Sequence, residues 1–355
     1  MELLTLQKAE LATFIATLLE ERRVVAPVRR DGDLAFAAIA TPDEAVLRYP
    51  NTRASVKAAF FPQVECMVRY ERALDRYNEA TSTPLDTTPT VLLGARPCDA
   101  RSLLLLDGVF GQGQYLDPYY LARRENTVIV SLACDRPRQT CFCHWFGSGP
   151  YDATGSDVLL RDAGDAYVVE PVTDRGRALL AEFSLAPAGD ATVARAEEIE
   201  EQAAARLTPV EPVEGIQDAL DGLFDSPVWG EVAEKCLACG TCTYLCPECH
   251  CFNIEDRVLP ASGERVRAWD SCMYPGFTVH ASGHNPRPDQ AARWRQRAMH
   301  KFDYLPRNVG LYGCVGCGRC VQACPVGLDI RAVLRSVRQA AAEAEAAAVA
   351  ENTGE

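Results

Sequence analysis

Two runs of four cysteines with the same spacing constrain this chain more than any other feature of its sequence. Each run reads C-x2-C-x2-C-x3-C-P, and the runs place their cysteines at Cys236, Cys239, Cys242 and Cys246, and at Cys314, Cys317, Cys320 and Cys324. Eleven of the 16 cysteines lie between Cys236 and Cys324, and the first 230 residues hold only five. In a chain of 355 residues, clustered cysteines are more typical of metal ligands than of a disulfide framework.

This spacing is the one with which bacterial two-cluster ferredoxins hold two [4Fe–4S] clusters. Gaps of two residues let three thiolates of one loop reach three irons, and Gly240 and Gly318 permit a tight backbone approach. The fourth cysteine begins a segment that leads away, so it reaches the other cluster. The sequence therefore predicts Cys236, Cys239, Cys242 and Cys324 as ligands of cluster 1, and Cys314, Cys317, Cys320 and Cys246 as ligands of cluster 2. The alternative for both runs is a pair of zinc sites.

Both predicted clusters have all four corners occupied by protein, so neither offers an open iron to a substrate. The sequence therefore predicts a relay of single electrons, with no catalytic residue and no substrate site of its own. The dinucleotide-binding pattern G-x-G-x-x-G after a strand and the pattern G-x-x-x-x-G-K-[ST] are both absent. We therefore expect no flavin or nicotinamide site in this chain, and electrons must come from another protein.

Four further cysteines, in the first half of the chain, form a candidate third metal site. Cys98 follows one predicted buried strand and Cys134 ends another, and neighbouring parallel strands end at one edge of a sheet, where ligands usually bind. Cys141 and Cys143 lie in the next loop, and His144 is a reserve ligand. These four cysteines predict a third iron–sulfur cluster, with a zinc site or buried structural thiols as alternatives.

Cys249, Cys251 and Cys272 lie between the two runs, and Cys66 lies far upstream. Together they are a candidate for another site. The alternative that we favour is semi-buried thiols beside the clusters, or a redox-active dithiol able to reduce disulfides or to bind sulfur.

The predicted fold is an α/β or α+β N-terminal domain followed by a mainly α-helical two-cluster ferredoxin-type domain. The pattern predicts a helix over residues 6–21, strands over 24–28, 34–39, 90–93 and 127–132, a hairpin over 157–169, and helices over 174–185 and 194–206. We expect domains at residues 1–206 and 229–335, a linker at 207–228 that contains LTPVEPVEG, and an Ala/Glu-rich, frayed tail at 336–355. Each cysteine run is expected to open a helix.

The net charge of −13 repels a phosphate backbone, so we expect no nucleic-acid partner. The longest apolar stretches are too short for a membrane span, and the N-terminus lacks the features of a secretory signal, so we expect a cytoplasmic location. One stretch between the runs is basic. It carries Arg287, Arg293, Arg295, Arg297 and Lys301, which either dock an acidic partner, shield cluster charge, or form a solvated helix face.

Several segments together resemble a known group of proteins. GARPCDARSLLLLDGVF, DPYYLARREN, CDRPRQTCFC, CPECHCF, WDSC, GHNPR and CVGCGRC are similar to segments of the iron–sulfur β subunit of cytosolic sulfhydrogenases, and equally to the iron–sulfur subunit of anaerobic sulfite reductase. The likeness runs from about residue 60 to 330. It implies an iron–sulfur subunit that takes electrons from an FAD-binding, NAD(P)H-oxidising partner and passes them to a catalytic partner, either a nickel–iron hydrogenase or a sirohaem sulfite reductase. It also implies the eight ligand cysteines above, and favours a metal role for Cys98, Cys134, Cys141 and Cys143.

The sequence leaves two other classes of function open. One is a free-standing disulfide or polysulfide reductase that uses Cys249, Cys251 or Cys272. The other is an iron–sulfur redox sensor or assembly scaffold that acts on protein, since the charge argues against action on DNA.

Overall fold

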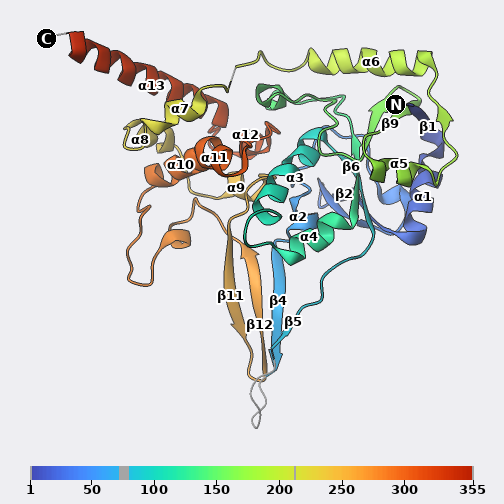
Figure 1. Cartoon of the computed structure of the whole chain (residues 1–355), viewed down its shortest axis with the longest axis horizontal. Helices are drawn as coiled ribbons and strands as arrows, with labels where there is room; N and C mark the ends of the chain where they lie inside the picture. The colour runs from blue at the N-terminus through green and yellow to red at the C-terminus, as the bar shows by residue number, and fades with distance from the viewer. Residues whose placement is uncertain (1, 72–79, 212, 354–355) are drawn as a thin grey trace.

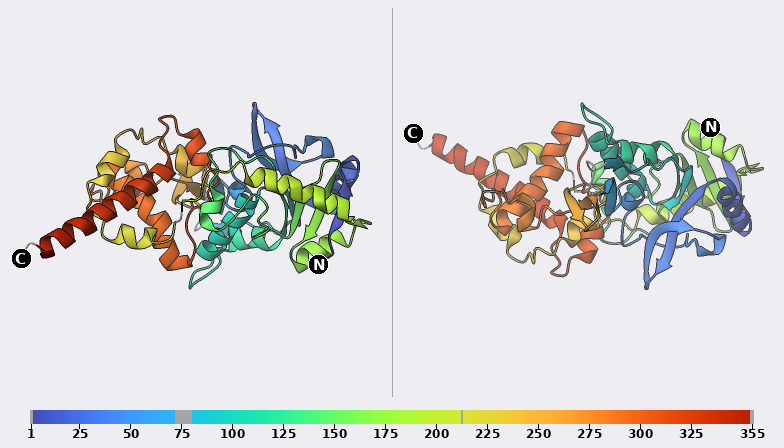
Figure 2. Two further views of the ribbon diagram at one scale, coloured as in Figure 1. Left: turned by 90° about the horizontal axis from the view of Figure 1, so that it is seen from above. Right: turned by 90° about the horizontal axis from the view of Figure 1, so that it is seen from below.

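The computed structural model describes residues 2–71, 80–211 and 213–353. The molecule is elongated, with a large β-sheet at one end and the cysteine-rich helices at the other (Figures 1 and 2). A smaller sheet projects from the middle, and the last helix extends beyond the body (Figure 1). In these three ranges, no helix has the length and apolar character that a bilayer crossing needs.

The large sheet has eight strands in the order β10-β1-β9-β8-β7-β6-β2-β3. Its centre is parallel, from β2 through β6 and β7 to β8, and both edges are antiparallel. The strands are β1 (Leu4–Gln7), β2 (Arg23–Arg30), β3 (Asp33–Ile39), β6 (Thr90–Ala95), β7 (Thr127–Leu132), β8 (Val158–Asp162), β9 (Ala166–Pro171) and β10 (Ala186–Pro187).

Both faces of the parallel centre are covered. In β6, Val91 and Leu93 pack into one core with Phe14, whereas Leu92 packs into a second core with Leu103. Two-sided burial explains why β6 and β7 are continuously apolar rather than alternating. The helices of this part are η1 (Lys8–Glu10), α1 (Leu11–Glu21), η2 (Pro42–Glu44), α2 (Lys57–Phe60), α3 (Pro97–Phe110), α4 (Pro118–Glu125), η3 (Cys143–Phe146), α5 (Asp174–Leu180) and α6 (Asp190–Ala204).

The smaller sheet joins segments that are far apart in the sequence. Its order is β11-β12-β4-β5, all antiparallel, with Val266 of β12 opposite Cys66 of β4. The strands are β4 (Val64–Glu71), β5 (Ala80–Ser82), β11 (Phe252–Val258) and β12 (Ser262–Trp269). A hairpin inserted between the two cysteine runs is thus completed by a strand from the N-terminal half.

The cysteine-rich end is built from short helices around a third core. Trp229, Trp294 and Phe302 pack there with Phe142 and Phe146 of the N-terminal half. The elements are α7 (Ile216–Asp221), α8 (Val228–Ala233), α9 (Thr241–Tyr244), η4 (Pro275–Thr278), α10 (Gln290–Met299), the π-helical turn η5 (His300–Tyr304), α11 (Leu305–Val309), α12 (Arg319–Ala323) and α13 (Ile330–Thr353).

The predicted α/β class, the strands of the large sheet and the β8–β9 hairpin are confirmed. The prediction of a helix from residue 6 was wrong, because Leu6 is buried in β1 opposite Tyr167, and the α-helix begins at Leu11. The cysteine-rich part contains the hairpin β11–β12 besides its helices. Residues 207–228 include α7, whose Ile216 and Leu220 are buried, and helix α13 continues through the tail to Thr353.

Candidate iron–sulfur centres

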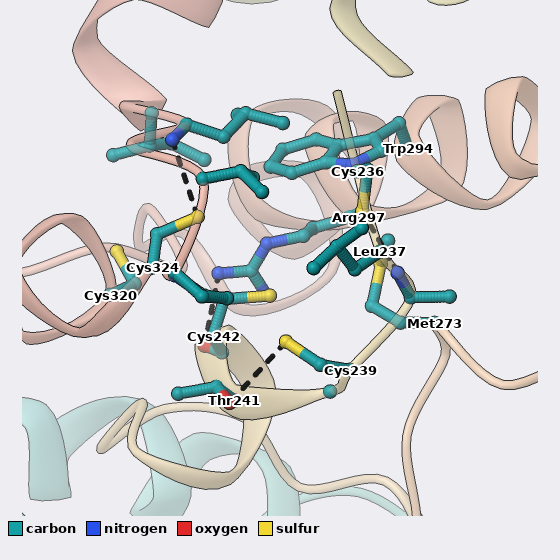
Figure 3. A pocket seen from close by; sticks show the side chains of 16 residues that line it. Cys236, Leu237, Cys239, Thr241, Cys242, Met273, Trp294, Arg297, Cys320 and Cys324 are labelled. Atoms are coloured by element: carbon teal, nitrogen blue, oxygen red, sulfur yellow. Dashed lines mark hydrogen bonds between the residues drawn. The ribbon is translucent and has the colours of Figure 1, made fainter. Parts of the chain in front are cut away.

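One cavity collects the four cysteines predicted for cluster 1. Cys236, Cys239, Cys242 and Cys324 all line this space, and Figure 3 shows their side chains around it. Cys236 and Cys239 come from the loop that leads into α9, Cys242 lies in α9, and Cys324 comes from the end of α12, 78 residues beyond the first run's last cysteine. The fold therefore brings the fourth cysteine of the second run to the first three of the first run.

A second, neighbouring cavity collects the four cysteines predicted for cluster 2. Cys246, Cys314, Cys317 and Cys320 line this space. Cys320 lines both cavities, and so do Arg297 and Ile330, so the two spaces are directly adjacent. The crossed arrangement predicted from the spacing is thus the arrangement of the two cavity walls.

The glycines inside the runs hold the positive φ angles that the predicted turns need. Gly240 has φ +71° and Gly318 has φ +72°, and each immediately precedes the short helix that its run opens. A Cβ at Gly318 would lie 2.4 Å from the Thr140 carbonyl oxygen. The second run is therefore pressed against the loop that carries Cys141 and Cys143.

Several ligand candidates accept or share hydrogen bonds at sulfur. The Cys236 sulfur accepts from the Ala238 amide at 3.4 Å and from Gln290 Nε2 at 3.2 Å, and the Cys324 sulfur accepts from the Leu328 amide at 3.2 Å. Cys239, the exposed ligand candidate, contacts Thr241 Oγ1 at 3.4 Å, and this contact and the Thr241 amide lower the pKa of its thiol. Such contacts favour thiolate and set the potential of a bound cluster.

Burial opposes ionisation at most of the remaining thiols. It raises the pKa of Cys242, of Cys314 and of Cys317, and it raises the pKa of Cys320 to about 12. Thiols in this condition are ligands only when a cation or a cluster replaces the proton.

Buried cations of the basic stretch offset the unfavourable effect of burial on the ionised thiols. Arg297 and Lys301 are 2% and 4% exposed. Lys301 Nζ donates to the Cys246 sulfur at 3.3 Å, and Arg297 Nη2 donates to the Cys242 carbonyl at 3.1 Å. Burial alone would lower the pKa of both groups, but the surrounding thiolates, Cys242 foremost for Arg297 and Cys246 for Lys301, raise it well above the usual value. The sequence left three roles open for this basic stretch: docking of an acidic partner, shielding of cluster charge and a solvated helix face. Shielding of cluster charge is the role that fits the buried Arg297 and Lys301.

Two donors that line the first cavity lack a partner among the described residues. Arg297 Nε and Trp294 Nε1 are buried and unpaired. Donors aimed at an anionic cluster with sulfide acceptors would be satisfied. In the ranges that the structure describes, no three Cys, His, Asp or Glu side chains converge as ligands of one metal ion would. Four thiols around each space, no three of which converge on one point among the described residues, fit a cluster with separate irons better than a single zinc ion.

The four N-terminal cysteines gather beside the second cavity. β6 and β7 pair in parallel, so Cys98 in the first turn of α3 and Cys134 after β7 share one sheet edge, as predicted. Burial, then neighbouring thiolates, raise the pKa of Cys141 to about 11 and of Cys143 to about 12. The neighbours of Cys143 are Cys141 and Cys134, and Cys98 is close enough to interact with Cys143. The Cys141 thiol also contacts the Cys317 carbonyl oxygen at 3.8 Å, so the N-terminal cysteines lie next to the wall of the second cavity.

The Nε2 atom of His144 contacts the Thr208 carbonyl oxygen at 2.7 Å, so this nitrogen is not a ligand candidate alongside the four N-terminal cysteines. Cys66 is also separate. Its thiol contacts the Val68 carbonyl at 3.6 Å and Thr83 Oγ1 at 3.5 Å, on the projecting sheet. Cys249, Cys251 and Cys272 lie at the base of that sheet, close to the cavities.

Sequence reasoning missed three buried side chains near the cysteines. Lys57 is 2% exposed, lies over the Trp269 ring at 3.7 Å and donates to the Cys249 carbonyl at 2.7 Å. Arg319, which follows Gly318, is 4% exposed, and Glu248 is 2% exposed. Charged side chains are normally solvated, so the only signal of burial in the sequence was that Glu248 and Arg319 lie next to or within a cysteine run; Lys57 had no such signal.

The comparisons with known proteins agree with this geometry. Residues 235–328 match the family model described as a 4Fe-4S dicluster domain. The chain is similar to the sulfhydrogenase 2 subunit beta of Pyrococcus furiosus, with 33% identity over 329 residues, which are 92% of this chain and 95% of the relative. No solved structure matches. This chain, with its dicluster domain, its paired cysteine-lined cavities and its full-length likeness, belongs to the family of sulfhydrogenase β subunits.

Proposed function

We propose that this chain is the iron–sulfur electron-transfer subunit of a multi-subunit cytosolic oxidoreductase. In this role it relays electrons between a reductase subunit that binds FAD and NAD(P)H and a catalytic partner, a nickel–iron hydrogenase that also reduces sulfur. The observation that carries the proposal is the pair of adjacent cavities, each of which has the four cysteines of one crossed set in its wall, with Cys320 in both walls.

The proposed ligands follow the two cavity walls. Cys236, Cys239, Cys242 and Cys324 hold cluster 1, and Cys314, Cys317, Cys320 and Cys246 hold cluster 2. When bound there, [4Fe–4S] clusters supply one-electron redox chemistry. Other residues of the chain support the ligands. Lys301 and Arg297 balance the thiolate charge. The amides of Ala238 and Leu328 donate to the sulfurs of Cys236 and Cys324 and hold them in place.

Cys98, Cys134, Cys141 and Cys143 are proposed to hold a third cluster. The contact of Cys141 with the Cys317 carbonyl supports a position next to cluster 2. Cluster 1 and a third centre would give the chain two places at which partners can dock. At the cluster 1 end, Cys239 is exposed and Leu237 is 65% exposed, which supports an apolar contact there.

The experiment that tests the proposal is a count of iron and acid-labile sulfide per chain after anaerobic purification, with an electron paramagnetic resonance spectrum of the reduced sample. About eight irons with coupled signals support the two-cluster relay, and about twelve support the third cluster as well. Zinc without iron would contradict the proposal.

Two variants make the count specific. Cys324→Ser should reduce the iron content by about four and leave the cluster 2 signal. Cys66→Ser is the matched control, since Cys66 lies on the projecting sheet, and it should leave the iron content unchanged. A loss of all iron in both variants would contradict the ligand assignment. Partner identity is tested by mixing the chain with a flavin reductase subunit, then following cluster bleaching with NADH or NADPH.

A further inference from the structure

A polar pocket lies outside the walls of the two cysteine-lined cavities, where segments far apart in the sequence meet. Its volume is about 430 Å³, and it is bordered by the β2–β3 hairpin, the loop at residues 51–53, the loop after β7 and helix α12. Among the described residues, no cysteine and no aromatic side chain lines it. The pocket is therefore separate from the proposed cluster ligands, and it offers no ring against which a nucleobase could stack.

The lining of this pocket is positively charged, although the net charge of the chain is −13. The charged lining residues are Asp33 and four arginines, Arg29, Arg53, Arg138 and Arg319. A concave wall with one sign of charge concentrates its field and attracts counterions. Arginine also presents a planar fork of N–H donors that matches the oxygens of phosphate and carboxylate groups. The lining therefore favours an anion with several oxygens.

Arg319 holds the inner wall of the pocket in a fixed geometry. It is 4% exposed and is paired with Asp99 at 2.8 Å. It donates from Nε to the Thr52 carbonyl at 3.0 Å and from Nη2 to Asn51 Oδ1 at 2.6 Å. Asn51 Nδ2 in turn donates to the Cys317 carbonyl at 3.3 Å. These contacts order the inner wall before a ligand arrives, which lowers the entropic cost of binding.

The outer wall carries arginines that are available to an anion. Arg29 is exposed in β2 and has no ion pair within the part of the chain that the structure describes. Arg138 donates to the Asn51 carbonyl at 3.4 Å and likewise lacks a carboxylate partner there. Arg53 is paired with Asp33 at 2.8 Å, but the two side chains are 64% and 56% exposed. An ion pair so exposed contributes little stability, so Arg53 can exchange its partner for a bound anion.

The volume of the pocket favours a diphosphate over a single phosphate. At roughly 30 Å³ for each water molecule, about 430 Å³ is the space of about 14 waters. This space exceeds a single phosphate several-fold and accommodates a diphosphate together with bound water. A diphosphate is also a multivalent anion near neutral pH, which suits a wall with several arginines.

We propose that this pocket binds a diphosphate-type oxyanion. Arg29, Arg53 and Arg138 supply charge-assisted hydrogen bonds, and the ordered wall around Arg319 sets the shape of the site. The diphosphate is either inorganic or part of a nucleotide whose base stays outside the pocket. The inference goes beyond the relay and does not depend on it, because none of the proposed cluster ligands lines this pocket.

The test is isothermal titration calorimetry of the full-length anaerobic protein with inorganic pyrophosphate, in a buffer free of phosphate and of divalent cations. We expect saturable binding with one site per chain. ADP that binds as tightly as pyrophosphate would identify a nucleotide as the source of the diphosphate, and weaker binding of ADP would identify the inorganic ion. The proposal is overturned if neither diphosphate saturates at millimolar concentration, or if inorganic phosphate binds as tightly as pyrophosphate. Binding of a polyglutamate peptide without binding of pyrophosphate would also overturn it, since the pocket would then dock an acidic protein segment.

Two neighbouring arginines of β2 provide a variant and its matched control. Successive side chains of a strand point to opposite faces, and Arg30, unlike Arg29, does not line the pocket. Arg29→Gln should weaken pyrophosphate binding about tenfold or more, because one charge-assisted hydrogen bond is lost, and Arg138→Gln should do the same. Arg30→Gln removes the same charge and should leave the affinity within about twofold, because salt screens a charge outside the pocket.

Equal weakening by Arg29→Gln and Arg30→Gln would contradict a site in this pocket and assign the binding to general surface charge. Iron content, measured on each sample after the titration, shows whether pyrophosphate has extracted iron. The same measurement tests the proposed function separately from the anion site.

Discussion

Arg319 of α12 donates to Asp99 of α3 at 2.8 Å, and this ion pair is almost entirely buried, with the Asp99 side chain 0% exposed. Arg319 also donates to Asn51 Oδ1 and to the Thr52 carbonyl. The pair thus joins the second cysteine run to the helix that carries Cys98.

Removal of one partner of this pair should be costly. Asp99→Asn leaves the Arg319 charge buried without its counterion, which typically costs about 3–5 kcal/mol. We expect the midpoint of thermal unfolding of the anaerobic protein to fall by several degrees. The double variant Asp99→Asn with Arg319→Met removes both charges and should recover most of the loss. If Asp99→Asn has the same midpoint of thermal unfolding as the unaltered protein, the ion pair does not stabilise the fold.

The contact between the second run and the loop of Cys141 and Cys143 predicts a difference between two glycines. Gly316 and Gly327 have φ of +62° and +66°, but a Cβ at Gly316 would lie 2.4 Å from the Phe142 carbonyl, whereas Gly327 has nothing within 4 Å. Both alanine variants carry the cost of the left-handed backbone, about 1–2 kcal/mol. Gly316→Ala alone should also separate the loop from the run and lower the iron content. Equal iron in both variants would contradict this.

The position of Lys301 predicts a change in the potential of cluster 2. Its ammonium donates to the Cys246 sulfur, and a positive charge stabilises the more negative, reduced state. Lys301→Met should therefore make the potential more negative, by about 60 mV for each 1.4 kcal/mol lost in a one-electron couple. Lys8→Met, on the far sheet beside Asp162, is the control. Potentiometric titration followed by electron paramagnetic resonance measures both, and an unchanged potential would argue against charge compensation by Lys301.

Two half-buried histidines, His250 and His300, predict how stability depends on pH. Burial, then His250 and Lys301, lower the pKa of His300 to about 3, and burial lowers the pKa of His250. The unfolded chain binds protons near pH 6.5 while the folded chain stays neutral there, so the free energy of unfolding falls as the pH drops from 6.5 towards 3. Above pH 6.5 the two rings contribute no slope.

Urea unfolding at about pH 7.5 and pH 5.5 measures this slope. His300→Gln should lose less stability between the two pH values than the unaltered protein does. His284→Gln, at an exposed position, should behave like the unaltered protein. A slope that His300→Gln leaves intact would assign the pH dependence to other groups.

The features that sequence reasoning predicted are those that depend on the spacing of residues close together in the sequence. The spacing of the two cysteine runs predicted sets of four cysteines that share a cavity wall, because the spacing of a cluster loop is set by the cluster itself; their role as ligands stays a prediction. The apolar runs at residues 90–93 and 127–132 predicted neighbouring parallel strands and hence the shared edge of Cys98 and Cys134.

The features that it missed depend on partners far away in the sequence. All seven residues of β11 are exposed, so FNIEDRV has no alternation that would predict a strand; its pairing with β12 makes it one. Leu6 fits a helical pattern, but β1 is pulled into the sheet by its register with β9. Lys57 and Lys301 are buried by partners that come from distant segments, the Cys249 carbonyl and the Trp269 ring for Lys57, and the Cys246 sulfur and the Gly313 carbonyl for Lys301.

The projecting sheet has a consequence for biosynthesis. β4 is made roughly 200 residues before β12, which pairs with it, and at about 5–20 residues per second the ribosome needs on the order of 10–40 s to supply that partner. During this interval one edge of β4 is open and able to pair with another chain. The nascent chain therefore carries an open strand edge until shortly before its second cysteine run is translated, and slower synthesis prolongs that exposure.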